Sequence, residues 1–275
     1  MILYRTRQQI LVEHARRWYA VPGEWDALFN RRDLAAFLRG IIKRGKPLRR
    51  APAPAELLAP IGNQEVWAAG VTYSRSRTAR MSESKQAGAS DFYDRIYHAA
   101  RPELFFKATP HRTAGPGAAM HLRRDSRWIV PEPELTLAID KRGRIIGYTI
   151  GNDLSCRDLE GENPLYLPQA KTFNACAGLG PGILVSPKPL PRTTIIGLDI
   201  RRRGRSIYKG STRISEIRKP FRVLVEYLFR DNTFPTGCLL MTGTGVVPAG
   251  RFCLRRGDEV RITVAPIGTL VNHMS

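Results

Sequence analysis

The feature that most constrains the fold is a pair of apolar runs joined by a short charged turn. Residues 128–140 and 145–153 each have the pattern of a β-strand, with many aliphatic and β-branched side chains. The segment Lys141-Arg-Gly-Arg144 between them has the composition of a turn. We therefore predict a β-hairpin with a two-residue loop at Arg142-Gly143. The loop fixes the pairing register, and the register decides which side chains share a face.

Three carboxylates converge on one face of this hairpin. In the predicted register Glu132 lies opposite Asp153, and Glu134 lies opposite Gly151. Because side chains alternate along a strand, the three acids share one face. Acids this close repel one another unless a cation lies between them, and a divalent cation that prefers oxygen ligands would relieve the repulsion. On these residues alone, a metal site and a row of solvent-exposed acids are equal alternatives.

Composition favours a strand-rich globular chain. The 275 residues, 43% of them hydrophobic, suffice for one large domain or for a large and a small one. With 24 Gly, 20 Pro and many short β-like runs, the sequence predicts a mostly β fold with some α. We expect no membrane span and no secretory signal, because neither an apolar run of roughly 18 residues nor a signal-like N-terminus is present. The four cysteines lack metal-ligand spacing, which favours reduced thiols and a cytoplasmic protein.

The formal net charge of +20 raises the alternative of a nucleic-acid-binding protein. The basic residues are spread along the chain, however, and the densest cluster, Arg201-Arg-Arg-Gly-Arg205, looks like the flank of a strand and turn. We find no known nucleic-acid-binding motif, so we do not expect nucleic acid to be the main partner. The positive charge suits attraction of a small anionic substrate.

Residues 1–60 and 61–275 are expected to form a small and a large domain, separated by a Pro- and Ala-rich segment at 47–60. Between Tyr73 and Arg101 lies a polar stretch that is either a surface loop or a lid over the acids. The large domain is predicted to consist mainly of short strands separated by turns. Apart from the hairpin, the expected elements are strands at 8–12 and 17–21 and helices at 32–42, 74–86 and 216–230.

Several motifs together resemble the fumarylacetoacetate hydrolase family, and within it the branch of 2-keto-3-deoxy-sugar-acid (arabinonate/xylonate) dehydratases. The resemblance implies a β-rich catalytic domain of the fumarylacetoacetase C-terminal type, a small N-terminal α+β domain and a homodimer. The segments that carry it are 65–73 (EVWAAGVTY), 91–94 (DFYD), 101–107 (RPELFFK), 130–135 (VPEPEL), 151–164 (GNDLSCRDLEGENP), 167–171 (LPQAK) and 240–245 (LMTGTG).

The resemblance assigns a metal to the acids that the hairpin brings together. Members of this family hold Mg²⁺ with two Glu of an E-x-E strand and an Asp of the following strand. These positions match Glu132, Glu134 and Asp153 in this sequence. Because pairing geometry leads to the same three residues, the metal site is favoured over a row of exposed acids.

Other roles are implied by the resemblance alone. Glu103 matches the general acid/base of the dehydratase-like branch. Lys171 matches a lysine beside the metal, where it would stabilise a developing enolate. The substrate-binding residues would be Arg75, Lys171 and Thr244, and the residues that orient the metal ligands would be Arg157 and Asp158.

The implied reaction is Mg²⁺-dependent dehydration of a small anionic 2-oxo acid, a 2-keto-3-deoxy pentonate, to a 2,5-dioxo acid through an enolate. The alternative within the family is hydrolysis of a carbon–carbon bond in an acylpyruvate, which needs a His–Glu pair. His98 is the only histidine near the predicted lid, and its surroundings do not match that pair. A basic nucleic-acid-binding or scaffold protein without catalysis is the alternative outside the family. Arg213, where the family pattern predicts a small residue, is a further departure.

Overall fold

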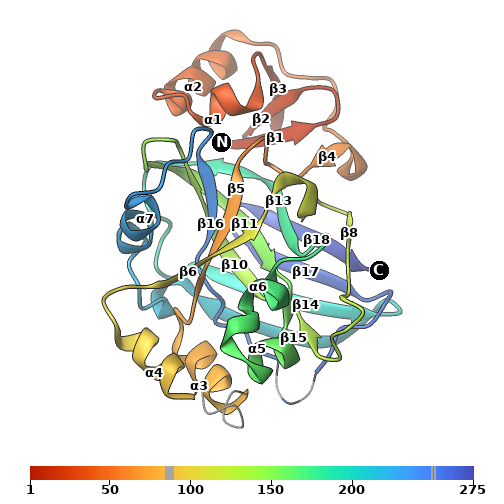
Figure 1. Cartoon of the computed structure of the whole chain (residues 1–275). Helices are drawn as coiled ribbons and strands as arrows, with labels where there is room; N and C mark the ends of the chain where they lie inside the picture. Colours follow the sequence, from red (N-terminus) through yellow and green to blue (C-terminus); the bar gives the residue numbers. More distant parts are fainter. Residues whose placement is uncertain (84–89, 249, 251) are drawn as a thin grey trace.

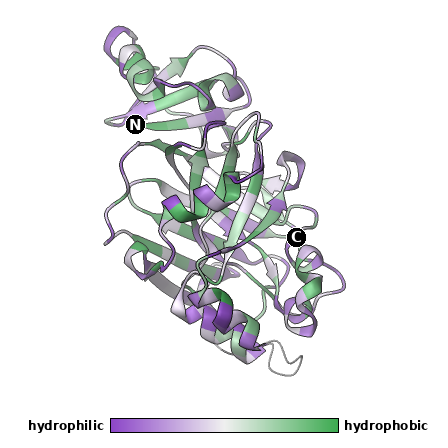
Figure 2. Ribbon diagram, turned by 60° about the vertical axis from the view of Figure 1, so that its left-hand side comes forward, coloured by the Kyte–Doolittle hydropathy of each residue, from purple (hydrophilic) through white to green (hydrophobic). Residues whose placement is uncertain are grey.

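The structure is a computed structural model that describes residues 1–83, 90–248, 250 and 252–275. Two β-sheets pack face to face at its centre, and strand residues outnumber helical ones, which confirms the predicted fold class (Figure 1). Hydrophobic residues line the strands at the centre, whereas hydrophilic residues colour much of the helices and loops (Figure 2). No helix of the described residues is long and apolar enough to cross a membrane.

The larger sheet has 11 strands and carries the predicted hairpin. Its main path runs in the order β3–β2–β1–β13–β11–β10–β16–β5–β6, with β4 beside β1 and β7 beside β13. The strands are β1 (Ile2–Thr6), β2 (Ile10–His14), β3 (Arg17–Val21), β4 (Leu57–Leu58), β5 (Glu65–Gly70), β6 (Glu103–Ala108), β7 (Thr113–Ala114), β10 (Pro133–Ile139), β11 (Ile145–Asp153), β13 (Ala177–Val185) and β16 (Cys238–Met241).

The smaller sheet has five strands in the order β15–β14–β17–β18–β8. These are β8 (Ala119–Met120), β14 (Ile195–Arg202), β15 (Arg205–Arg213), β17 (Glu259–Val264) and β18 (Gly268–Met274). A separate two-stranded ribbon pairs β9 (Ile129–Val130) with β12 (Ser155–Cys156). Arg213 ends β15 with its side chain exposed, so its size meets no obstacle there.

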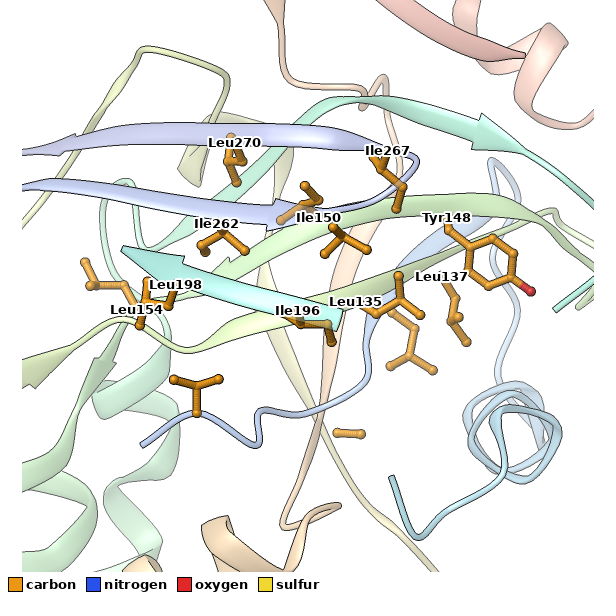
Figure 3. Close-up of a cluster of buried hydrophobic side chains, with 14 of the residues drawn as sticks. Leu135, Leu137, Tyr148, Ile150, Leu154, Ile196, Leu198, Ile262, Ile267 and Leu270 are labelled. Carbon is orange, nitrogen blue, oxygen red and sulfur yellow. The ribbon is translucent and has the colours of Figure 1, made fainter. Parts of the chain in front are cut away.

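The main core fills the space between the two sheets. Leu135 and Ile150 of the larger sheet face Ile196 and Ile262 of the smaller sheet, and all four are buried (Figure 3). Because side chains alternate along β10, the neighbouring Glu134 lies on the opposite face. The apolar face of β10 therefore holds the two sheets together, and its other face, which carries Glu134, can form a site.

The β10–β11 hairpin has the predicted register across the acids. Glu134 pairs with Gly151, and the Asp153 N–H donates to the Glu132 carbonyl at 3.0 Å. The predicted two-residue loop is wrong, because Asp140 N–H donates to the Arg144 carbonyl at 2.9 Å and leaves a three-residue turn between them. A β-bulge beyond Ala138 compensates for the change in loop length. The acids consequently keep their predicted pairing.

The N-terminal strands extend the larger sheet, since β1 pairs with β13. β3 has the predicted bounds, whereas β2 begins two residues late because the Thr6 hydroxyl donates to the Gln9 carbonyl at 2.7 Å and holds a turn there. Figure 1 shows this region at one end of the molecule. The division into domains at residue 60 stays a prediction.

Seven α-helices lie around the sheets in the described part of the chain. They are α1 (Trp25–Phe29), α2 (Leu34–Arg44), α3 (Ser74–Glu83), α4 (Ser90–His98), α5 (Arg157–Glu162), α6 (Leu167–Lys171) and α7 (Phe221–Phe229). The helix expected at 216–230 is shorter, because Pro220 disfavours helical geometry in the residue before it. The end of the helix expected at 74–86 lies outside the described residues. Short 3₁₀ turns occupy Pro54–Glu56, Pro110–Arg112, Pro164–Tyr166 and Ile214–Glu216.

Candidate active site

The three acids of the hairpin form a buried cluster. Glu132, Glu134 and Asp153 are each at most 4% exposed. One carboxylate oxygen of each lies within 4.8 Å of those of the other two. The register of β10 and β11 produces this cluster, since the acids come from paired positions on one face. The structure thus brings together the predicted metal ligands.

The loop after β16 holds one of these acids in place. The Gly243 backbone N–H donates to the Glu134 carboxylate. Gly243 has a φ of +91°, and a Cβ there would collide with the Thr72 hydroxyl. Only glycine therefore allows the loop to approach Glu134 in this conformation.

Two buried lysines bind carboxylates of the cluster. Lys171 Nζ lies 2.8 Å from Glu132, 3.0 Å from Asp153 and 2.6 Å from the Ser155 hydroxyl. Lys107 Nζ lies 2.6 Å from the other Asp153 oxygen and donates to the Leu154 carbonyl at 2.9 Å. Both ammonium groups thus fix the orientation of the Asp153 carboxylate.

Two buried arginines bind the Glu132 oxygen that Lys171 does not contact. Arg80 of α3 lies 2.7 Å from Glu132, and Arg157 of α5 lies 2.9 Å from the same oxygen. Arg80 also binds Glu160, and Arg157 lies 2.8 Å from Glu83. These ion pairs join α3 and α5 over the acids, because each helix supplies both an arginine and a carboxylate.

The cations change the ionisation of the acids unequally. Burial raises the pKa of Glu132, but Lys171, Arg157 and Arg80 outweigh it and hold that pKa well below its usual range. Burial, Asp153 and Glu132 together raise the pKa of Glu134 well above its usual range. Burial opposes the charge on Lys171, yet its carboxylate neighbours keep the pKa of its ammonium group raised. The repulsion among the three carboxylates is thus expressed in the raised pKa of Glu134.

The charges and donor atoms fit a divalent cation. In the part of the chain that the structure describes, six carboxylates and four cationic side chains gather here, which leaves a formal charge of minus two. Three buried carboxylates are an oxygen donor set that Mg²⁺ or Mn²⁺ accepts. An ion among them would relieve the repulsion at Glu134. The six carboxylates are those of Glu83, Glu103, Glu132, Glu134, Asp153 and Glu160, and the four cations are Arg80, Lys107, Arg157 and Lys171.

Glu103 lies beside this cluster at the start of β6. Its cross-strand partner on β5 is Gly70, where a Cβ would collide with the Glu103 carboxylate. Burial raises the pKa of Glu103 to about 7, with Glu160 and Glu132 adding to the effect and Arg80 and Lys171 opposing it. A carboxyl group with this pKa can both accept and donate a proton near neutral pH.

Thr244, Arg157 and Asp158, which were also predicted for the site, differ in what they contact. Thr244 lines the pocket, but its hydroxyl accepts from the Val246 N–H at 3.2 Å and donates to the Val246 carbonyl at 3.3 Å. Arg157 lies 2.9 Å from Glu132. Asp158 instead accepts from the Ser126 hydroxyl and the Arg127 N–H, so it orients the 126–128 segment.

Arg75 is exposed and is not among the residues that line the pocket. Arg80, on the same helix, is the arginine that reaches the acids.

Several residues of the site were not predicted from the sequence. Lys107 follows Glu103 and Phe105 with the period of two that a strand requires, so one face of β6 carries all three. That spacing could have identified Lys107 from the sequence. No sequence pattern identifies Arg80 and Glu160, because their ion pairs depend on how α3 and α5 pack. The other residues are Glu83, Tyr93 and Ser155.

His98 lies outside the pocket. Its side chain is 52% exposed, its Nε2 is 3.7 Å from the Asp94 carboxylate and 3.2 Å from the Arg77 guanidinium, and it does not line the pocket. The space enclosed by the lining residues is about 30 Å³, close to the share of one water molecule in the liquid. A larger ligand therefore requires α3 and α4, or their side chains, to shift.

Comparison with known proteins agrees with this geometry. Residues 66–275 match the family model described as fumarylacetoacetate (FAA) hydrolase C-terminal. A probable 2-keto-3-deoxyxylonate dehydratase of Haloferax volcanii is 47% identical over 218 residues, 78% of this chain and 74% of that protein. The 2-dehydro-3-deoxy-D-arabinonate dehydratase of Saccharolobus solfataricus is 45% identical over 215 residues, 77% of this chain and 72% of that protein. A solved 2-keto-3-deoxy-D-arabinonate dehydratase, complexed with magnesium and 2,5-dioxopentanoate, superposes with a TM-score of 0.84 and 33% identity over 100% of this chain and 98% of the other.

Proposed function

The chain belongs to the fumarylacetoacetate hydrolase family, and we propose that it is a Mg²⁺-dependent dehydratase of a 2-keto-3-deoxy pentonate. The observation that carries the proposal is the buried cluster of Glu132, Glu134 and Asp153 with Glu103 beside it. The similarity to two proteins named for this reaction, and to a structure that holds magnesium and 2,5-dioxopentanoate, supports the substrate. Mn²⁺ would serve in place of Mg²⁺, since both accept carboxylate ligands.

Glu132, Glu134 and Asp153 would hold the ion. The metal, when bound, polarises the C2 carbonyl of the substrate and so makes the C3 protons acidic. Glu103, with a pKa of about 7, takes one C3 proton as a base. The same carboxyl group then donates a proton to the departing C4 hydroxyl, which leaves as water. The unsaturated product tautomerises to the 2,5-dioxo acid.

Cationic side chains stabilise the negative charge that develops in this reaction. The Lys171 ammonium group lies against the acid cluster, where it would pair with the enolate oxygen or the substrate carboxylate. We assign Thr244 and Arg75 to substrate binding by family resemblance. Their contacts would form when α3 moves, because the hydroxyl of Thr244 binds backbone and Arg75 is exposed. Arg157 orients Glu132, and Asp158 supports it by holding the 126–128 segment.

Hydrolysis of an acylpyruvate is the alternative that the site supports less well. That reaction needs a base to activate water near the metal. The exposed His98 is bound to Asp94 and Arg77 instead of facing the acids. This placement favours dehydration over hydrolysis.

We further propose that the protein acts as a homodimer in the cytoplasm, with residues 1–60 as a separate small domain. The homodimer rests on family resemblance. The four cysteines are all free, as expected in a reducing compartment.

A comparison of two substrates tests the proposed function. Purified protein with Mg²⁺ is given a 2-keto-3-deoxy pentonate or an acylpyruvate, and the products are identified by NMR. We expect 2,5-dioxopentanoate from the first and no pyruvate from the second. Pyruvate release without dioxo acid would refute the dehydratase and support the hydrolase.

A further inference from the structure

Three side chains with a hydroxyl group line the pocket, and two of them are bound to backbone. Ser76 Oγ donates to the Tyr73 carbonyl at 2.9 Å, and Thr244 is bound to Val246 through both its donor and its acceptor. The third is Tyr93, whose hydroxyl has no hydrogen bond to any described residue. Tyr93 is therefore the hydroxyl group of this lining that is free to bind a ligand.

Helix α4 directs Tyr93 inward. Tyr93 is partly buried in the pocket, whereas its neighbour Phe92 is 58% exposed and lies against Arg95. Tyr97, one turn later, packs under the guanidinium groups of Arg77 and Arg218 and does not line the pocket. The two tyrosines of one helix thus have different surroundings, which makes Tyr97 a natural control.

Tyr93 and Glu103 line the pocket together at the edge of the larger sheet. The metal-ligand acids come from β10 and β11, whereas Glu103 begins the edge strand β6, which α4 directly precedes in the chain. Burial raises the pKa of the Tyr93 hydroxyl, with Glu160 and Glu103 adding to the effect and Arg80 and Lys171 opposing it. Tyr93 is consequently a neutral hydrogen-bonding group beside the acid/base.

A neutral hydroxyl among paired charges suits a neutral polar atom of the ligand. The anionic end of the substrate belongs at the metal and Lys171, and Glu103 acts at C3 and C4. The next polar atom along a pentonate chain is the hydroxyl on C5. We propose that Tyr93 binds this C5 hydroxyl and so makes the enzyme select a hydroxylated chain end. This inference rests on the proposed dehydratase function.

Two substrates and two variants test the proposal. The substrates are a 2-keto-3-deoxy pentonate and its analogue with a methyl group at C5, 4-hydroxy-2-oxopentanoate. The variants are Tyr93→Phe and the control Tyr97→Phe, each of which removes one hydroxyl from α4. Selectivity is measured as the ratio of kcat/KM for the two substrates at saturating Mg²⁺, and thermal melting verifies that each variant is folded.

We expect Tyr93→Phe to lose about two- to tenfold of the selectivity for the pentonate, the effect of one neutral hydrogen bond. Its activity on the methyl analogue should stay near that of the wild type, and Tyr97→Phe should keep the full selectivity. Equal losses on both substrates, or unchanged selectivity in Tyr93→Phe, would overturn the assignment while leaving the dehydratase intact. A wild type that converts neither substrate would overturn the dehydratase proposal and this inference together.

Discussion

We expect replacement of Gly70 by alanine to lower the catalytic rate while leaving the free energy of unfolding nearly unchanged. A Cβ at Gly70 would meet both oxygens and the carboxyl carbon of Glu103, its cross-strand partner. The obstructing atoms are the far end of a flexible side chain, so we expect Glu103 to swing away while the strands stay paired. In this new position the Glu103 carboxylate would no longer reach the substrate.

The expected effect of Gly70→Ala on stability is much smaller than its expected effect on the catalytic rate. Rotating Glu103 out of its preferred conformer costs about 0.5–1.5 kcal/mol. Replacing glycine by alanine stabilises the folded protein by about 0.4–1 kcal/mol, because it reduces the conformational entropy of the unfolded chain. The free energy of unfolding should therefore change by less than about 1 kcal/mol. Loss of a positioned acid/base, in contrast, lowers kcat by about 10²–10⁴-fold.

The assay combines kcat at saturating Mg²⁺, the Mg²⁺ dissociation constant and urea unfolding. Gly197→Ala is the matched control, because Gly197 also lies in a strand and a Cβ there has only the Thr263 carbonyl nearby, at 3.8 Å. We expect this control to keep wild-type activity. Full activity of Gly70→Ala, or a loss of Mg²⁺ affinity as large as the loss of kcat, would show that Gly70 does not act by positioning Glu103.

The pKa of Glu103, the burial of Leu137 and the exposure of His98 each lead to a measurable expectation. In wild type kcat/KM should rise with pH through an ionisation near 7, because Glu103 must be deprotonated to act as a base; Glu103→Gln should lose this ionisation along with most of its activity. Leu137→Ala should lower the free energy of unfolding by about 2–5 kcal/mol in urea titrations, because Leu137 is 0% exposed in the main core; a loss below 1 kcal/mol would contradict its place there. His98→Ala should keep the dehydratase rate within about twofold, since its imidazole lies outside the pocket, and a hundredfold loss would reopen the hydrolase mechanism.

The acid cluster could be predicted from the sequence because it depends on local geometry. Alternation along β10 and pairing with β11 are enough to bring Glu134 and Asp153 together. The loop length was predicted wrongly, yet the register across the acids was right, because the hydrophobic residues must face the smaller sheet. A shift of one residue would have turned Leu135 and Leu137 away from the core.

The cationic half of the site could not be predicted in the same way. Arg80 and Glu160 are far apart in the sequence and meet only because α3 packs against α5. No alternation or helical period encodes such a contact, and many arginines of this basic chain were equally plausible partners. Arg75, predicted to bind substrate, and Arg80 lie on the same helix, and Arg80 is the one that contacts Glu132 in this structure.

The dependence of product formation on Mg²⁺ tests whether Glu132, Glu134 and Asp153 hold a catalytic metal ion. Wild type and Asp153→Asn are titrated with Mg²⁺ after EDTA treatment, and 2,5-dioxopentanoate is measured from a 2-keto-3-deoxy pentonate. We expect no product without metal, saturable product formation in wild type, and a folded Asp153→Asn whose Mg²⁺ affinity falls by at least tenfold. Equal product formation with and without Mg²⁺, or an unchanged titration of Asp153→Asn, would contradict it.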